Sequence, residues 1–277
     1  MNCRISFEFF PPKTDKGRDK LQHVISDLGA YNPEFFSVTY GAGGSTRDGT
    51  QNTITEVLNA GYQAAPHLSF GGDDEASMEK MLNDYKDAGV KRIVALRGDV
   101  PSGSGAVKLV YANELVEFIR KTTGDHFQIE VAAYPEIHPE SDSFTSDLDY
   151  FKAKIDAGAN SAITQYFFNA DAYFYYVEQC QKLGIDAPIY PGIMPVTNYE
   201  SLIRFSGTCG AEIPRWVKKR LESLNGDQEA LLDYGTELVS GLCQQLIDGG
   251  APGIHFYTLN QSPAIQKICD NLGFSRS

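Results

Sequence analysis

Residues that can move protons or hold anions stand at the ends of several short apolar runs along the chain. Glu8 lies near the end of the first run, His67 near the end of the third, and Arg97 directly after the fourth. A carboxylate and an imidazole can exchange protons with a substrate, and a guanidinium can bind a phosphate or a carboxylate. Further polar residues and glycines at such positions are Thr39, Tyr40, Gly98, Asp99, Tyr134, Glu136, His138, Gln165 and Tyr257. The pattern favours an enzyme active site.

Glu8 is the sharpest candidate for proton transfer. Successive residues of a strand face opposite sides, so Ser6 and Glu8 point away from Ile5, Phe7 and Phe9. If the large apolar side chains meet surrounding helices, Glu8 points into the interior of the fold. Burial raises the pKa of a carboxyl group, and a raised pKa suits a general acid near neutral pH. The sequence therefore predicts that Glu8 is a proton donor with a raised pKa.

Two of these features also have a purely structural interpretation. Glu8 can instead form an ion pair with Arg4, Arg92 or Arg97 that ties the strands together, because structural ion pairs also perturb pKa values. For the segment 97–99, turn chemistry by itself favours a solvated turn after a strand. The residues alone leave both interpretations open.

Metal and phosphate-loop chemistry receive little support. The five histidines never show the spacing of metal ligands, so the sequence predicts no metal site. His67, which follows a proline, is by itself typical of a buried histidine with satisfied hydrogen bonds. The glycine-rich stretch 41–46 resembles a phosphate-binding loop only weakly, because no Lys-Ser or Lys-Thr pair follows it.

Eight short apolar runs alternate with longer segments of helical periodicity, and these elements must position the candidate residues. The first helical segment has Leu21, Val24, Ile25 and Leu28 at positions i, i+3, i+4 and i+7. The expected strands are Ile5–Phe9, Phe35–Tyr40, Ala64–Phe70, Arg92–Leu96, Gln128–Ala133, Ala162–Tyr166, Ile189–Ile193 and Ile254–Tyr257. Such alternation indicates parallel βα units, and eight of them favour a closed (β/α)8 TIM barrel.

The same pattern predicts the organisation of the whole chain. Endings such as 87–89, 156–158 and 248–250 place a glycine where a helix stops before the next strand. An extra helix is expected near Pro214–Leu224, before a long helix at Ala230–Ile247. No G-x-G-x-x-G motif follows the first strand, which counts against a Rossmann domain. We therefore expect a single domain over residues 1–277, with its active site at the carboxyl ends of the barrel strands.

Composition narrows the classes of partner and the compartment. The net charge of −12 argues against a surface for nucleic acid or an anionic membrane, although it allows small anionic ligands. The five cysteines are far apart and form no C-x-x-C pair, so reduced thiols are expected. No apolar run approaches the length of a membrane span. We expect a soluble cytoplasmic protein, and the sequence is compatible with a homo-oligomer.

Several motifs, in order along the chain, resemble those of the methylenetetrahydrofolate reductase family. They include SFEFFPP at 6–12, SVTYGA at 37–42, APHL at 65–68, VALRGD at 94–99 and AAYPEIHP at 132–139. Those that follow are DAGAN at 156–160, AITQ at 162–165, PGIMP at 191–195 and HFYTLN at 255–260. The resemblance covers essentially the whole chain, and it is the joint match that is specific.

The resemblance implies a TIM barrel that uses FAD and a nicotinamide reductant, NADH or NADPH. It implies reduction of 5,10-methylenetetrahydrofolate to 5-methyltetrahydrofolate, which supplies methionine synthesis. By matching motif, Glu8 corresponds to the general acid that protonates N10 of the folate. Asp99 corresponds to a carboxylate beside the flavin and the pterin, Gln165 to an amide that binds the pterin, and Phe205 to an aromatic that stacks on the substrate or the nicotinamide nucleotide.

The implied FAD contacts gather cations and polar groups around an anionic pyrophosphate. They are Thr39, His67, Arg97, Gly98, Asp99, Tyr111, Ala112, Tyr134, His138, Asp147, Lys154 and Tyr257. The family often has a second basic residue where this chain has Ala153, so either Lys152 or Lys154 can supply the phosphate contact. Gln261 stands where some relatives carry arginine, which leaves recognition of the folate glutamate tail open.

A C-terminal regulatory domain is not expected, because the chain ends soon after the eighth strand.

The residues also allow other functions. Glu8 and Asp99 could instead serve as the acid–base pair of a cofactor-free lyase or aldolase. The barrel could also bind folate without catalysis, or reduction could require an electron-transfer partner in place of NADH.

Overall fold

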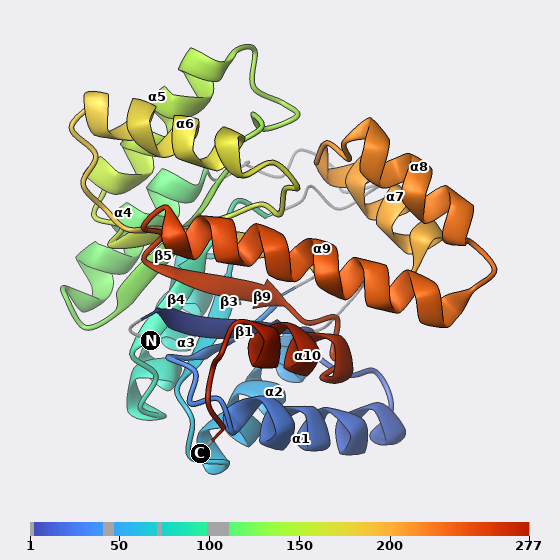
Figure 1. Ribbon diagram of the computed structural model, residues 1–277. Helices are drawn as coiled ribbons and strands as arrows, with labels where there is room; N and C mark the ends of the chain where they lie inside the picture. The colour runs from blue at the N-terminus through green and yellow to red at the C-terminus, as the bar shows by residue number, and fades with distance from the viewer. Residues whose placement is uncertain (1–2, 41–46, 71–73, 99–110, 277) are drawn as a thin grey trace, which may run out of the picture.

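The computed structural model describes residues 3–40, 47–70, 74–98 and 111–276, and parallel strands alternate with helices through them (Figure 1). The strands are β1 (Arg4–Phe9), β2 (Phe36–Val38), β3 (Ala64–Leu68), β4 (Arg92–Ala95), β5 (Gln128–Ala133), β6 (Ser161–Thr164), β7 (Ile189–Tyr190), β8 (Gly192–Ile193) and β9 (Gly253–Tyr257). The helices are α1 (Asp15–Gly29), α2 (Arg47–Asn59), α3 (Glu75–Asp87), α4 (Ala112–Thr123), α5 (Phe144–Asp156), α6 (Ala170–Lys182), α7 (Tyr199–Cys209), α8 (Arg215–Leu224), α9 (Gln228–Asp248) and α10 (Pro263–Asn271).

The strands form one parallel sheet that curls into a nearly closed barrel. Their order is β7-β6-β5-β4-β3-β2-β1-β9-β8, so β7 and β8 stand at the two ends of the sheet. These two short strands correspond to the single expected strand Ile189–Ile193. Pro191 divides it, because proline has no backbone N–H to donate to a sheet. Its carbonyl still accepts the His255 N–H at 3.0 Å. The prediction of a (β/α)8 barrel is thus confirmed, with its seventh strand split in two.

The outer face of the barrel carries the main apolar core, as strand alternation predicts. Phe7 stacks on Phe36 and on Phe256, with ring centroids 5.7 and 5.9 Å apart, and Phe9 stacks on Phe36 at 5.1 Å. All four rings are almost completely buried between the strands and the helices. This packing fixes which way β1 faces, so the alternate residues Ser6 and Glu8 point inward.

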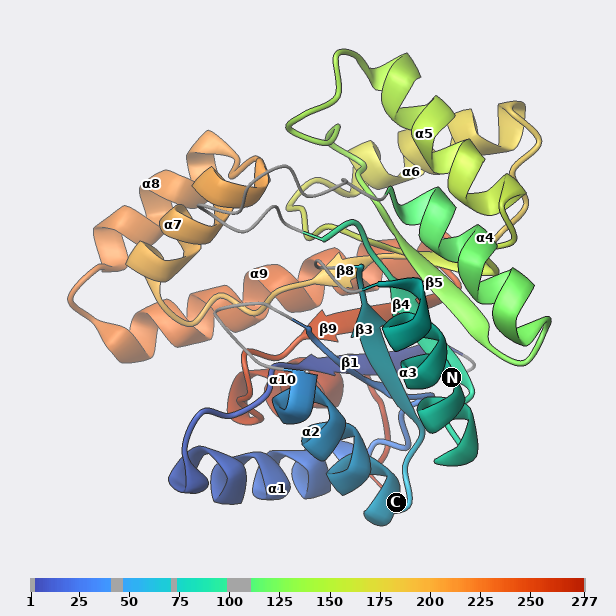
Figure 2. The same cartoon turned by 180° about the vertical axis from the view of Figure 1, so that it is seen from behind.

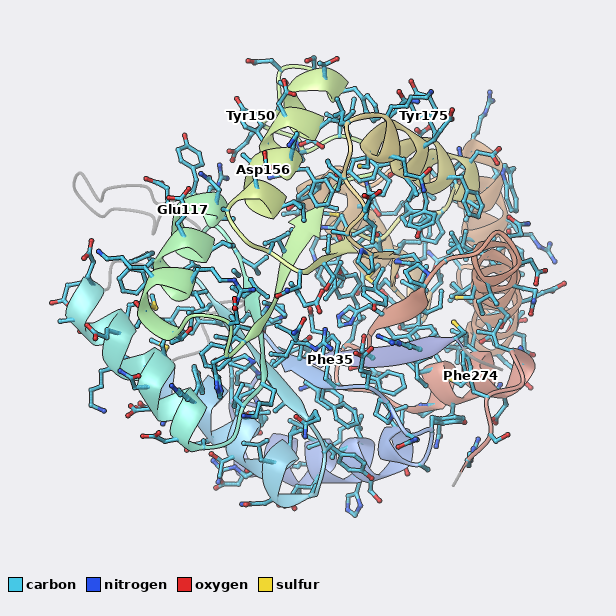
Figure 3. The ribbon with its side chains drawn as sticks, turned by 90° about the vertical axis from the view of Figure 1, so that its left-hand side faces the viewer. Phe35, Glu117, Tyr150, Asp156, Tyr175 and Phe274 are labelled. Atoms are coloured by element: carbon cyan, nitrogen blue, oxygen red, sulfur yellow. The ribbon has the colours of Figure 1, made fainter. Side chains whose placement is uncertain are left out.

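The barrel interior has two layers below its mouth. An apolar inner belt consists of Phe35, Ala65, Val94, Ile163 and Tyr190. Figure 3 shows Phe35 near the centre of the ring of strands, whereas Tyr150 and Tyr175 point outward from α5 and α6.

The second layer is charged and lies where the strands begin. Arg92, which opens β4, forms ion pairs with Glu130 of β5 and with Glu34, the latter at 2.6 Å. Glu130 is completely buried and also accepts a hydrogen bond from Ser161 at 2.6 Å. Arg4 pairs with Glu34 at 3.6 Å. This layer closes the end of the barrel opposite the mouth.

The helix endings agree with the sequence. Helices α3 and α5 end at Asp87 and Asp156, and the glycines that follow, Gly89 and Gly158, have φ of +86° and +112°. Side chains rarely adopt this conformation, so glycine suits both turns. The extra helix expected near 214–224 is α8. It forms with α7 a pair that stands apart from the ring of helices (Figures 1 and 2).

Candidate active site

Glu8 lies in the barrel between two histidines. Its Oε2 atom is 3.3 Å from Nε2 of His67 on β3 and 3.8 Å from Nε2 of His255 on β9. The Glu8 side chain is 18% exposed, against 9% for His67 and 0% for His255, so the carboxylate is the member of the group that reaches toward solvent. The predicted inward orientation of Glu8 is confirmed.

The alternative in which Glu8 only pairs with an arginine is wrong. Arg4 and Arg92 bind Glu34 at the opposite end of the barrel. Arg97 binds Glu140 at 2.5 Å. Every arginine that the sequence offered as a partner is thus committed to another carboxylate, and Glu8 faces imidazoles instead.

The expectation of a raised pKa for Glu8 is also wrong. Burial does raise the pKa of this carboxyl group, but the charge of His67 and the hydrogen-bonding and charge of His255 outweigh it and lower the pKa to about 2. Opposite charge at this distance favours the ionised carboxylate. Sequence reasoning counted only the burial, because it did not bring the two histidines to the same carboxylate.

His255 and Ser6 are site residues that the sequence reasoning missed. Ser6 is the register partner of His255 on the neighbouring strand, and its Oγ lies 2.7 Å from His255 Nδ1. This contact fixes the ring so that Nε2 faces Glu8. Alternation could have found it, because His255 stands two residues before Tyr257 and therefore shares its face of β9.

A group of cations lies beyond the ends of β4 and β5. Burial lowers the pKa of Lys154 to about 8, and the charge of Asp147 opposes this shift. Burial and then the charge of Arg97 lower the pKa of His138, with Lys154 acting in the same direction. Glu140 and Asp147 oppose the shift of His138. The charges of Arg97 and Lys154 therefore both act on His138, and they favour its neutral form.

The structure distinguishes between the two lysines of α5. Lys154 points toward the barrel, where its Nζ donates to the carbonyl of Ala132 at 2.6 Å. Lys152 pairs with Asp156 at 2.7 Å one turn along the same helix. Only Lys154 joins the group of cations, so it is the better candidate for a phosphate contact.

Other expected cofactor contacts surround the same mouth. Thr39 is buried, and its Oγ1 makes no hydrogen bond within the described part of the chain. The rings of Tyr134 and His138 meet edge to face at 4.5 Å. Tyr111 is the N-cap residue of α4, with Ala112 the first residue of that helix. Asp99 and the glycine-rich stretch 41–46 lie outside the described residues, and the described chain stops next to Asp99 at the half-buried Gly98.

Tyr257 fills the space beside the two histidines. Its ring meets that of His255 at 5.3 Å, and its hydroxyl donates to the carbonyl of Thr164 at 2.7 Å. Burial, followed by the charge of Glu8, holds the pKa of Tyr257 well above its ordinary value, so the phenol stays protonated. A Cβ on Gly192 would lie 2.0 Å from the Thr164 carbonyl and 2.7 Å from the Tyr257 ring. Glycine is therefore required at this close approach.

The structure describes two further expected substrate residues, Gln165 and Phe205. Gln165 lines a small recess with Tyr134, and its Oε1 accepts the N–H of Tyr166 at 3.0 Å. This bond leaves the Gln165 NH₂ group to donate to a ligand. Phe205 lies on α7 next to Ser206, whose Oγ is 3.0 Å from the Tyr166 hydroxyl. One tyrosine therefore connects the positions of Gln165 and Phe205.

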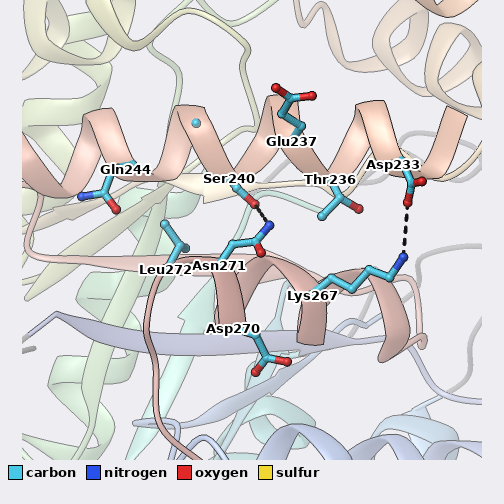
Figure 4. Close-up of a pocket in the computed structure, with 10 residues that line it drawn as sticks. Asp233, Thr236, Glu237, Ser240, Gln244, Lys267, Asp270, Asn271 and Leu272 are labelled. Carbon is cyan, nitrogen blue, oxygen red and sulfur yellow. Dashed lines mark hydrogen bonds and ion pairs between the residues drawn. The ribbon is translucent and has the colours of Figure 1, made fainter. Parts of the chain in front are cut away.

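A larger groove lies elsewhere, between α9 and α10 (Figure 4). Lys267 reaches Asp233 across it at 3.4 Å, and Asn271 donates to Ser240 at 3.1 Å. It is lined by polar surface residues, and none of the candidate residues borders it. This groove is therefore not where the candidate residues lie.

Neither a metal site nor a membrane span is found in the part of the chain that the structure describes. No cluster of three His, Cys, Asp or Glu residues there could hold a metal ion. No helix there is long and apolar enough to cross a bilayer. All five cysteines are free thiols, as expected.

Comparison with known proteins places the chain in a family. The family model described as methylenetetrahydrofolate reductase matches residues 1–273. The 5,10-methylenetetrahydrofolate reductase of Escherichia coli K12 is 39% identical over 270 residues, which cover 97% of this chain and 90% of that protein. A probable methylenetetrahydrofolate reductase (NADH) of rice is 36% identical over 284 residues, covering 97% of this chain and 48% of that protein.

A solved structure shows the same fold. It is an uncharacterised protein from Clostridium thermocellum that binds two copies of 5-methyl-5,6,7,8-tetrahydrofolic acid, with a TM-score of 0.71 and 16% sequence identity. The alignment covers 98% of this chain and 94% of that one. The family match over nearly the whole length and the identity to the bacterial enzyme lead to one conclusion: this chain belongs to the methylenetetrahydrofolate reductase family.

Proposed function

We propose that this protein reduces 5,10-methylenetetrahydrofolate to 5-methyltetrahydrofolate, with FAD as resident cofactor and NADH as reductant. The observation that carries the proposal is the half-buried Glu8 carboxylate held between two imidazoles at the mouth of a barrel of this family. We further propose that the barrel of residues 1–277 is sufficient for the reaction.

The residues at the mouth fit an anionic dinucleotide. Arg97 and Lys154 supply positive charge within a protein whose net charge is −12, and the neighbouring His138 ring, whose lowered pKa favours its neutral form, offers hydrogen-bonding nitrogens. The unpaired Thr39 hydroxyl offers a buried hydrogen-bonding group to a ligand. When bound there, FAD supplies the hydride chemistry that links the nicotinamide to the folate. The chain itself holds the pyrophosphate and excludes water from the mouth.

Glu8 is assigned the delivery of a proton to N10 of the folate, which opens the five-membered ring of the substrate. The low pKa of Glu8 depends on positive charge on His67 and His255. When a folate covers the mouth and removes water, an ion pair becomes costlier, and a neutral carboxylic acid beside a neutral imidazole is favoured. Glu8 would then carry the proton that N10 receives.

Gln165 and Phe205 are assigned the pterin end and the aromatic middle of the folate. The Gln165 NH₂ group donates to the pterin, since its oxygen is already bound to the Tyr166 N–H. Asp99 is assigned to the pterin N–H groups. A single mouth offers little room for a nicotinamide and a folate together, so the two substrates bind in turn and ping-pong kinetics follow.

Replacing Glu8 with glutamine tests the proposal. The variant keeps the size of the side chain but has no proton to deliver, so folate reduction is expected to fall by at least about 100-fold. Reduction of the flavin by NADH should continue, because it needs no proton on N10. The exposed Glu117, changed to Gln in a matched control, should leave both half-reactions unchanged.

Three outcomes would contradict the proposal in different ways. Full folate reduction by Glu8→Gln would remove Glu8 from its role. Purified protein with no flavin absorbance and no uptake of FAD would indicate a cofactor-free enzyme. A flavoprotein that NADH cannot reduce, but that a chemical reductant can, would indicate a separate electron-transfer partner.

A further inference from the structure

Helix α7 carries Phe205 but buries little of its own surface. Of its 11 residues, all of which the structure describes, Leu202 and Ser206 alone are buried. Figures 1 and 2 both show α7 and α8 outside the ring of helices that covers the strands. Hydrophobic stabilisation is roughly proportional to the apolar area removed from water, so apolar packing fixes α7 only weakly. Polar contacts must therefore contribute to its position.

A tyrosine at the end of β6 supplies a polar contact to α7. Tyr166 is 5% exposed, and its hydroxyl lies 3.0 Å from Ser206 Oγ. Burial and then a hydrogen bond with Cys209 raise the pKa of Tyr166, so its phenol stays protonated near neutral pH. Ser206 and Cys209 both belong to α7. The Tyr166 hydroxyl is therefore bonded to two residues of the same helix.

The backbone of Tyr166 also orients a neighbouring side chain. Its N–H donates to Gln165 Oε1 at 3.0 Å, which leaves the NH₂ group of that amide for a ligand. Both residues line one recess together with Tyr134 and Cys209. Tyr166 thus sets the direction of the Gln165 amide and also the position of the helix that carries Phe205.

The other polar and close contacts of this region hold only the end of α7. Gly210 caps the helix with φ of +76°, and a Cβ there would lie 2.8 Å from Pro139 Cγ. Beyond it, the Glu212 N–H donates to Glu136 Oε2 at 2.8 Å. The Tyr166 hydroxyl reaches α7 about one turn earlier. Without that hydroxyl the end of α7 stays attached, but the rest of the helix can tilt.

We infer that Tyr166 is a positioning residue, which sets the spacing between the Gln165 amide and the Phe205 ring to match the pterin and the aromatic middle of the folate. This inference rests on the proposed function. The Tyr166 hydroxyl does not itself touch the ligand, because it is buried and bonded to α7. Its effect therefore falls on the binding of a folate that reaches both positions.

The test is Tyr166→Phe in the holoenzyme, which removes only the hydroxyl. We expect the KM for methylenetetrahydrofolate to rise about five-fold, the worth of one neutral hydrogen bond, with kcat unchanged. Flavin reduction at saturating NADH should also stay unchanged. Calorimetric titration with 5-methyltetrahydrofolate, which needs no turnover, should show the same loss of affinity, about five-fold.

Two double variants test the route of the effect. Tyr166→Phe with Ser206→Ala should be no worse than Tyr166→Phe alone, because both changes break the same contact. In a Phe205→Ala background, Tyr166→Phe should cause no further rise in KM, because no ring is left to position.

A matched control is Tyr173→Phe. Tyr173 on α6 is 2% exposed, and its hydroxyl donates to the carbonyl of Ile189 on β7 at 2.7 Å. This variant also loses one buried tyrosine hydroxyl, so its urea midpoint of unfolding should fall by an amount comparable to that of Tyr166→Phe. Its KM for the folate should not change. A general loss of stability would instead affect the KM of both variants alike.

Three results would overturn the inference. They are an unchanged KM and affinity in Tyr166→Phe, an equal rise of KM in Tyr173→Phe, and a further rise when Tyr166→Phe is added to Phe205→Ala. If the unmodified protein binds the folate but does not reduce it, the proposed function fails, and calorimetry still decides whether Tyr166 sets folate affinity. A protein that binds no folate would overturn both.

Discussion

Replacing His255 with glutamine should raise the pKa of Glu8. The change removes one of the two imidazoles that hold the carboxylate ionised, while a glutamine amide can still bond to Ser6. At 3.8 Å and an effective dielectric constant of about 20, two unit charges interact by about 4 kcal/mol, equivalent to about 3 pKa units. This figure is an upper limit, because the charge of His255 acts on Glu8 less than that of His67, which remains at 3.3 Å; a rise of about 1–2 units from the present value of about 2 is expected.

The stability of the protein should change with pH in the same sense. The pKa of Glu8 falls from 4.5 to about 2 on folding, so ionised Glu8 stabilises the fold above about pH 4.5. This stabilisation, about 3 kcal/mol at most, is lost as the pH falls from about 4.5 to 2. In His255→Gln the loss should be smaller by about 1–2 kcal/mol and confined to a narrower range of pH.

The measurement is a carbon-13 NMR titration of the glutamate carboxyl groups, with Glu8→Gln used to identify the Glu8 signal. Urea unfolding of both proteins at pH 7 and at the lowest pH at which they remain folded gives the stability. If the Glu8 signal titrates at the same pH with and without His255, the imidazole does not keep the carboxylate ionised. The reasoning about the pKa of Glu8 would then be refuted.

Two further predictions concern the cations. Lys154→Met should weaken FAD binding by about ten-fold. In the unmodified protein, the affinity for FAD should fall above about pH 8, where Lys154 loses its proton. Fluorescence titration with FAD measures both affinities. The variant should lack that dependence on pH, and an unchanged affinity would rule out the phosphate contact. Glu130→Gln should destabilise the fold by about 3 kcal/mol in urea unfolding, because Arg92 loses its completely buried partner. A loss below about 1 kcal/mol would show that Glu34 alone satisfies Arg92.

Local patterns were sufficient to predict the barrel. Alternation on β1 placed Phe7 and Phe9 outside and Glu8 inside, and glycines marked the helix ends, because each depends only on neighbours in sequence. The missing N–H of Pro191 could have indicated a break in the strand, but hydrophobic periodicity predicts one continuous strand over 189–193. Hydrophobic periodicity does not register the loss of one hydrogen bond.

Sequence reasoning found Glu8 and His67 but missed His255, Ser6 and the electrostatics of the group. The position of Glu8 followed from β1 alone. Its pKa depends on His67 and His255, which lie 59 and 247 residues away in sequence and meet it only when the barrel closes. The choice between Lys152 and Lys154 likewise required the orientation of α5 against β5. The pattern of one β-strand predicts the direction of a side chain, but it does not predict the charges on other strands that face this side chain.

The inner belt of the barrel has a consequence for the timing of proton transfer. It lies between Glu8 and the charged layer around Arg92, which leaves the mouth as the route for protons to Glu8. In the proposed reaction, a folate bound across the mouth would close that route. The proton used in each turnover would then already be in place when the folate arrives, and the pH of the medium would act on the enzyme between substrates and not during the reaction. Release of the product then becomes the step at which the site is reloaded.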